Sequence, residues 1–179
     1  MQTTPPIVDC GVHYVDVMCQ ITDAKPLRVH GMGLRLSDEI AADMYNYGQF
    51  QVVFADGSVG WYEAGWGPMM SEVAYFVKDV ISPQGAVSIM SGMHPASDSV
   101  EGHTKVGALR VHRVGEADRD VDFPGEPGHQ ALCNAEQAYM LRAIAEDINL
   151  TRHMEDAVAS LAICLAADES IRTGRAIEL

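Results

Sequence analysis

The chain has 179 residues, which suits one domain with a hydrophobic core, and its 47% hydrophobic and 21% charged content is typical of a globular protein. The formal net charge is −13, and the twelve lysines and arginines form no basic stripe, which argues against nucleic acids and anionic membranes as partners. No apolar run approaches the roughly 20 residues that span a bilayer, and no signal-peptide pattern opens the chain. We therefore expect a single cytoplasmic domain over residues 1–179.

The first predicted element is a helix over residues 9–21. Apolar residues recur there at helical spacing, at Val12, Val15, Met18 and Cys19. Two prolines precede the run, and Asp9 is expected to be its N-cap or an acid of its first turn. Asp9 and His13 are four residues apart, so a helix places both on one face, one turn from each other.

Between Leu27 and about Val114 the apolar pattern changes to a period of two, which predicts strands. The clearest signal is Asp56-Gly57 between two alternating runs, because a tight hairpin turn of this kind needs positive φ. A second hairpin is expected around a Pro-Gln-Gly turn. The predicted strand regions are 26–36, the hairpin 48–65, 72–82, 85–91 and 107–114, with loops over 92–105 and 115–128.

The last third of the chain is predicted to be helical. One helix is indicated by residues at helical spacing, namely Leu132, Ala135, Tyr139 and Arg142. A second helix is expected from about His153 to Thr173, with Gly174 as its stop signal. Ile177 and Leu179 predict a short closing strand. The sum is an α+β fold, an open, largely antiparallel β-sheet with helices packed on one face.

Large side chains are expected on both faces of this sheet, at Phe50, Phe54, Trp61, Tyr62, Tyr75 and Phe76. An antiparallel sheet can leave one face wet, but a bulky apolar face implies a partner. We therefore expect a homo-oligomer that forms through the exposed sheet face.

The cysteines and histidines show no metal-binding or redox spacing. Cys10, Cys19, Cys133 and Cys164 lie in apolar contexts without a C-x-x-C pair, which favours buried, reduced thiols. The seven histidines form no H-x-H or H-E-x-x-H pattern, and no structural zinc is expected.

Asp9 and His13 allow two interpretations. The first is an acid at a helix start followed by an exposed histidine. The second is half of a catalytic site, in which the histidine takes a proton from an alcohol and the carboxylate orients it. A helix N-terminus would lower the pKa of that histidine and keep it ready to act as a base.

The segment "EAGWGPMM", residues 63–70, ends a predicted strand in a bend rich in glycine and proline. It is either an irregular edge packed on the core or the wall of a pocket, because pockets combine apolar walls with a few polar groups. The second interpretation makes Trp66 a candidate substrate-binding residue. Gly31-x-Gly33 and Gly65-x-Gly67 do not complete G-x-G-x-x-G between a strand and a helix, so we assign them structural roles.

Three segments together resemble one known family. "PPIVDCGVHYVDVM" resembles the D-x-x-x-H segment of the glucose-fructose oxidoreductase / inositol dehydrogenase (Gfo/Idh/MocA) family. "FADGSVGWYEAGWG" resembles the central hairpin of that family's C-terminal domain, and "HMEDAVASLAICLAADESIRTGRAIEL" resembles its last helix and closing strand. The segments occur in the family's order and cover nearly the whole chain.

The resemblance implies that two domains have different functions. Members of the family bind NAD or NADP in an N-terminal Rossmann domain, and a C-terminal α/β domain supplies the substrate side of the cleft and the oligomer interface. By the resemblance, His13 acts as acid/base on a substrate hydroxyl, and Asp9 helps to bind and orient the substrate. The substrate is expected to be a sugar, a polyol or a related hydroxy compound.

The chain departs from the family because the nucleotide-binding half is missing. No G-x-G-x-x-G follows a strand, and no Glu-Lys-Pro carries the usual catalytic lysine; Lys25, Lys78 and Lys105 lie in segments that do not match. We therefore expect the C-terminal substrate-binding and oligomerisation domain of an NAD(P)-dependent oxidoreductase, without cofactor or metal residues of its own. NAD or NADP is expected in the full-length enzyme, and this chain alone should not catalyse hydride transfer.

Two alternatives remain open at this point. The chain can be a stand-alone binding or dimerisation module that has the sheet but no catalytic activity. It can also be a hydrolase or isomerase that uses Asp9 and His13 without a cofactor, but no motif supplies the nucleophile or metal that such a site needs.

Overall fold

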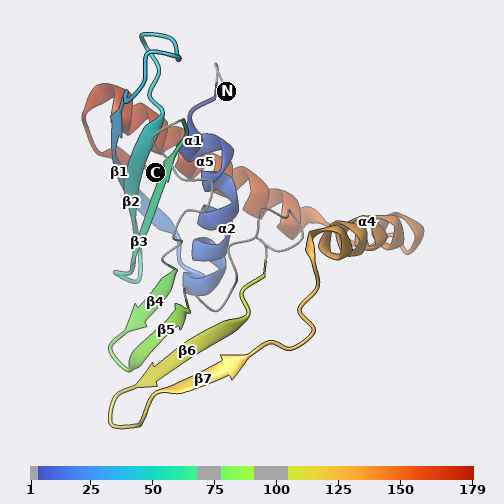
Figure 1. The fold of residues 1–179 in the computed structure, drawn as a ribbon. Coiled ribbons are helices and arrows are strands. Elements are labelled where there is room, and N and C mark those ends of the chain that lie inside the picture. Colours follow the sequence, from blue (N-terminus) through green and yellow to red (C-terminus); the bar gives the residue numbers. More distant parts are fainter. Residues whose placement is uncertain (1–3, 68–77, 91–104) are drawn as a thin grey trace. The chain divides into compact units, whose positions relative to one another are not determined.

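The computed structural model describes residues 4–67, 78–90 and 105–179 (Figure 1). The chain divides into two compact units: the first unit comprises residues 1–70 and 149–179, and the second unit comprises residues 71–148. The assignment of residues 1–179 to one domain stays a prediction. Within the described ranges, no helix is both long and apolar enough to cross a membrane.

The first unit begins with two short helices in place of one. Helix α1 spans Pro6–Asp9 and helix α2 spans Gly11–Thr22, with only Cys10 between them. The predicted helix is confirmed, but it starts earlier, because proline fits the first position of a helix, where its missing N–H costs nothing. Asp9 is not an N-cap: Pro5 and Cys10 hold those positions, and Asp9 is the acid in the first turn of α1.

Four antiparallel strands form the sheet of the first unit. They are β1 (Pro26–Leu34), β2 (Tyr47–Phe54), β3 (Val59–Gly65) and β8 (Ile177–Glu178), in the order β3-β2-β1-β8. The predicted hairpin is confirmed as β2 and β3. Gly57 has a φ of 85°, and the Asp56 carboxylate accepts hydrogen bonds from the N–H and the hydroxyl of Ser58.

The core of the first unit lies between this sheet and three helices. Helix α5 (Thr151–Thr173) packs on the same face as α1 and α2 (Figure 1), and it ends at Gly174 in the left-handed conformation, as predicted. Alternate residues of β2 face the helices, which is the period of two expected for a half-covered strand. The buried core residues are Ile7, Val15, Val29, Tyr45, Phe50, Val52, Phe54, Ile163, Cys164 and Ala167.

The opposite face of this sheet is not covered by these helices, and we call it the open face. Its residues occupy the alternate strand positions, including Met32, Gln49, Val59, Trp61 and Glu63. Phe50, Phe54 and Tyr62 lie on the helix-covered face, so of the aromatic residues named in the prediction only Trp61 is placed on the open face. Tyr75 and Phe76 lie outside the described residues.

The second unit contains another four-stranded antiparallel sheet. Its strands are β4 (Asp79–Ser82), β5 (Gly85–Ile89), β6 (Ala108–Arg113) and β7 (Arg119–Asp122), paired in chain order, and helix α4 (His129–Ala145) follows. The α+β class with antiparallel strands is confirmed, and the described strands are distributed over two sheets. Some predicted segments lie partly outside the described residues, namely 72–77 and 91 of two predicted strands, 92–104 of one predicted loop and 68–70 of the segment 63–70.

The predicted loop over residues 115–128 is wrong in part, because it contains β7. Gly115, with a φ of 84°, lets the chain reverse after β6. The charged residues that suggested a loop instead pair across the two strands: Arg110 donates two hydrogen bonds to Asp120, at 2.9 and 3.0 Å, and the His112 ring lies 2.7 Å from Asp118. Opposite charges at facing positions stabilise such a pair of strands.

Candidate substrate site

The site is built around the junction of α1 and α2, where Asp9 ends one helix and His13 lies in the first turn of the next. Cys10 keeps helical backbone angles, with φ −91° and ψ −27°, and the His13 N–H donates to the Cys10 carbonyl at 3.3 Å. The two candidate residues therefore remain one turn apart. Both side chains are exposed to solvent, so a small molecule can reach them.

Cys10 links Asp9 to Trp66. Its thiol donates to the Asp9 carboxylate with a sulfur–oxygen distance of 3.9 Å, and the Trp66 side chain is close enough to this thiol to lower its pKa. Burial and the neighbouring Asp9 charge raise the pKa of the Cys10 thiol, and Trp66 opposes them. Trp66 thus lies near Cys10, the residue that follows Asp9, whereas the His13 side chain makes no hydrogen bond within the described residues.

The junction is fixed to the sheet by close packing. A methyl group on Gly11 would lie 3.2 Å from the Cys164 sulfur and 3.4 Å from the Tyr62 ring, so only glycine allows this approach without displacement. Tyr14 stacks on Tyr62 with 5.1 Å between ring centroids. Tyr62 in turn contacts Phe50 of the core. Burial raises the pKa of Tyr62, so this residue is neutral and serves as a packing platform.

Trp66 is half-buried and lines a cavity of about 230 Å³ in the first unit. The polar lining includes Ser37, Glu39 and Asn46. Asn46 is 4% exposed, and the sequence analysis missed it, because a single asparagine before a strand has no pattern that marks it as buried.

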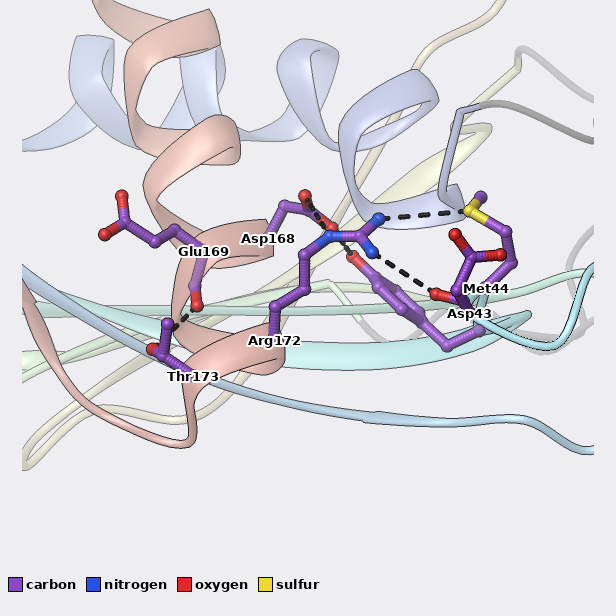
Figure 2. Close-up of polar contacts among 7 residues, drawn as sticks. Asp43, Met44, Asp168, Glu169, Arg172 and Thr173 are labelled. Carbon is purple, nitrogen blue, oxygen red and sulfur yellow. Dashed lines mark hydrogen bonds and ion pairs between the residues drawn. The ribbon is translucent and has the colours of Figure 1, made fainter.

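A polar cluster joins α5 to the segment before Asn46 (Figure 2). The Tyr45 hydroxyl donates to the Asp168 carboxylate at 2.7 Å, and the Arg172 guanidinium donates to its other oxygen at 2.8 Å. Arg172 also donates to the Asp43 carbonyl at 3.2 Å and lies 5.9 Å above the Tyr45 ring. Burial, together with the bond to Asp168, raises the pKa of Tyr45, so this phenol stays protonated as a donor.

The described residues do not fit a dinucleotide cofactor. Such a cofactor binds where a parallel strand leads through a glycine-rich turn into a helix. Every strand pair in the described ranges is antiparallel, and none continues into a helix through a G-x-G-x-x-G turn. These ranges also contain no cluster of histidine, cysteine or acidic residues that could hold a metal ion.

The cysteines differ from one another in burial. Cys164 is buried in the core, where desolvation raises its pKa to about 12. The prediction of buried thiols is wrong for Cys10, Cys19 and Cys133, which are partly exposed.

The fold of this chain is similar to part of several solved structures. No protein-family model matches the sequence, and no curated protein matches it. Solved structures do match: levoglucosan dehydrogenase in complex with NADH and levoglucosan superposes with a TM-score of 0.72, at 16% identity, over 96% of this chain and 49% of that chain. An oxidoreductase from Agrobacterium radiobacter in complex with NAD+, L-tartaric acid and magnesium gives 0.70, at 15% identity, over 96% and 48%.

A third match is the aldose-aldose oxidoreductase from Caulobacter crescentus complexed with glycerol, with a TM-score of 0.69 and 18% identity, over 94% of this chain and 46% of that chain. The chain spans about half the length of each of these three structures. Its fold is therefore the fold of one part of these oxidoreductases, which confirms the resemblance to the Gfo/Idh/MocA C-terminal domain at the level of fold.

Proposed function

We propose that this chain is the substrate-binding and oligomerisation part of an NAD(P)-dependent oxidoreductase that acts on a sugar, a polyol or a related hydroxy compound. One observation carries the proposal: the exposed residues Asp9 and His13 lie one turn apart, and Cys10 between them is near the half-buried Trp66, on a fold shared with half of several oxidoreductases. Three of those proteins were solved with levoglucosan, tartaric acid or glycerol, all hydroxylated molecules.

The three side chains suit a hydroxylated substrate. A neutral imidazole at His13 can accept the proton of an alcohol while hydride leaves the carbon. The Asp9 carboxylate can accept hydrogen bonds from other hydroxyl groups. The Trp66 indole offers an apolar surface for the C–H face of the ring or chain. NAD or NADP would supply the hydride chemistry, and the domain joined to this chain would bind it.

The test joins this chain to its own nucleotide-binding half and measures polyol oxidation with NAD or NADP. His13→Ala should lower turnover by about 10²–10⁴-fold, which is the usual contribution of a general acid or base. His153→Ala, a change to an exposed histidine in α5, is the matched control and should leave turnover unchanged. Normal turnover in His13→Ala would remove the assigned role. Sugar binding without turnover in the joined protein would favour a non-enzymatic binding module.

The oligomerisation role rests on the open face of the first sheet. Met32, Val59 and Trp61 are each more than half exposed there. Exposure of this apolar surface to water is unfavourable, and a second copy packed on the open face would bury it. Light scattering at micromolar concentration should show a dimer or a larger species. Trp61→Asp should shift the protein to the monomer. Val17→Asp, which changes an exposed side chain of α2, should not. A monomer before any substitution would contradict the proposal.

A further inference from the structure

Trp66 follows the last residue of β3, so its main chain lies just beyond the paired strands. There, Asn46 forms hydrogen bonds to the Trp66 main chain. The Trp66 N–H donates to the Asn46 carbonyl at 2.7 Å, and the Asn46 side-chain amide donates to the Trp66 carbonyl at 2.9 Å. One residue thus binds both main-chain polar groups of Trp66. Because these groups are fixed, the direction in which the indole leaves the backbone is fixed as well.

The side chain of Asn46 suits this position for a chemical reason. An asparagine amide carries a donor and an acceptor at once. The oxygen accepts the Leu36 N–H at 2.8 Å, and the nitrogen is the donor to Trp66. Exchanging oxygen and nitrogen would set donor against donor at Leu36, so the orientation is determined by the network. Asn46 therefore ties together the chain after β1 and the chain after β3.

The position of Asn46 is itself held from α5. Asn46 follows the segment that Asp168 and Arg172 bind through Tyr45 and the Asp43 carbonyl (Figure 2). Tyr45 is 7% exposed and belongs to the core, so this segment cannot shift without disturbing α5.

We propose that Asn46 is a positioning residue that sets the Trp66 indole in the candidate substrate site, and that Tyr45, Asp168 and Arg172 hold Asn46 in the place this requires. The proposal rests on the function proposed above, in which Trp66 is an apolar wall for a sugar or polyol. Asn46 lines the same cavity as Trp66 but acts on the site through Trp66.

The two tryptophans of the chain allow a direct test. Trp61→Phe leaves Trp66 as the only fluorescent indole, and Trp66→Phe leaves Trp61, which lies on the open face and donates to Gln49 at 3.1 Å. Asn46→Asp is then added to each single-tryptophan chain. Aspartate keeps the size of the side chain and the acceptor for Leu36, but it lacks the donor to the Trp66 carbonyl.

With Trp66 as the reporter, Asn46→Asp should move the emission to longer wavelength and increase quenching by acrylamide, because the indole becomes more exposed. With Trp61 as the reporter, both measurements should stay unchanged. Unchanged emission from Trp66 would overturn the proposal. An equal change in both reporters would also overturn it, because that result means general loosening of the unit.

A second pair of variants covers the case in which Asn46→Asp does not fold. Tyr45→Phe removes only the hydroxyl that donates to Asp168, and Tyr47→Phe removes a hydroxyl that donates to the exposed Glu63 at 3.0 Å. Tyr45→Phe should shift Trp66 emission in the same direction, by a smaller amount, and Tyr47→Phe should not. Equal effects would contradict the role of the cluster. These measurements need no substrate or cofactor, so their outcome is independent of the dehydrogenase test.

Discussion

The two units each contain a four-stranded antiparallel sheet, but the two sheets are stabilised in different ways. In the first unit, Phe50, Val52 and Phe54 are buried under three helices. In the described part of the second unit, the buried hydrophobic residues are Ala108 and Ala143, which are both small. Its strands are held by backbone ladders and by exposed charge pairs such as Arg110 with Asp120.

This difference shows where the stability of the chain originates. Burial of apolar area is the main favourable term in folding. Exposed ion pairs contribute little, and a small sheet needs a covered hydrophobic face for independent stability. We therefore expect the first unit to carry most of the free energy of unfolding, and the second unit to open more readily.

Hydrogen exchange should show the largest contrast. Amides of α5 from Ile163 to Ser170 lie against the core and should be protected almost to the limit of global unfolding. Amides of α4 should exchange faster by orders of magnitude, because a helix with one buried residue gains little from tertiary packing. The measurement is mass spectrometry of the two helices in one sample. Equal protection of the amides in α4 and α5 would contradict the expected difference in stability between the two units.

The second largest contrast is expected in the free energy of unfolding, when residues of the two sheets are substituted. Phe50→Ala should lower the free energy of unfolding by about 3–5 kcal/mol, because it removes a fully buried ring and leaves a cavity. Ile81→Ala in β4 should change it by no more than about 0.5 kcal/mol, because that side chain is 79% exposed. Urea unfolding of both variants measures this. A similar loss in each would mean that β4 is covered in solution.

A matched pair of serines tests the polar contacts. Ser170 is fully buried; its hydroxyl accepts the Gly31 N–H at 2.9 Å and donates to the Arg175 carbonyl at 2.5 Å. Ser170→Ala should lower the free energy of unfolding by about 1–3 kcal/mol, because it leaves the buried Gly31 N–H without a partner. Ser82→Ala removes an exposed hydroxyl in the second unit and should have a much smaller effect on urea unfolding. The reverse order would contradict the assignment of burial.

The smallest expected effect is on the pH dependence of stability. The hydrogen bond from Arg110 holds the pKa of Asp120 below its ordinary value of 3.8. A carboxyl group whose folded pKa is depressed stabilises the fold above its unfolded pKa, and this contribution is lost as the pH falls through the folded value. Asp120→Asn should therefore be slightly less stable than the parent at neutral pH and equal to it in strong acid. Because both side chains are exposed, added salt should shrink the difference.

Elements with a local chemical signal were predictable from the sequence. The turn of the first hairpin depends on Asp56 and Gly57, and the end of α5 depends on Gly174; both glycines adopt the positive φ that their positions require. The long helices followed from apolar spacing, although α4 shows that such spacing does not guarantee burial. The position of Asp9 and His13 one turn apart was also predictable, because spacing within a helix is a local property.

Features that depend on contacts distant in the chain were not predictable. Strand β7 was missed because Asp118 and Asp120 are typical loop residues until their partners on β6 are known. The role of Asn46 depends on Leu36 and Trp66, which are ten and twenty residues away. No local pattern shows that an asparagine will lie between two such segments.

The outer strands of the second sheet have one further consequence. β4 reads DVIS and β7 reads RDVD, and each forms an edge of the sheet among the described residues. An edge strand exposes unpaired backbone groups to which a strand of another molecule can add. Asp79 on one edge, and Asp122 on the other, would place negative charge against an incoming strand. The unit with the smaller core thus carries its own protection against aggregation.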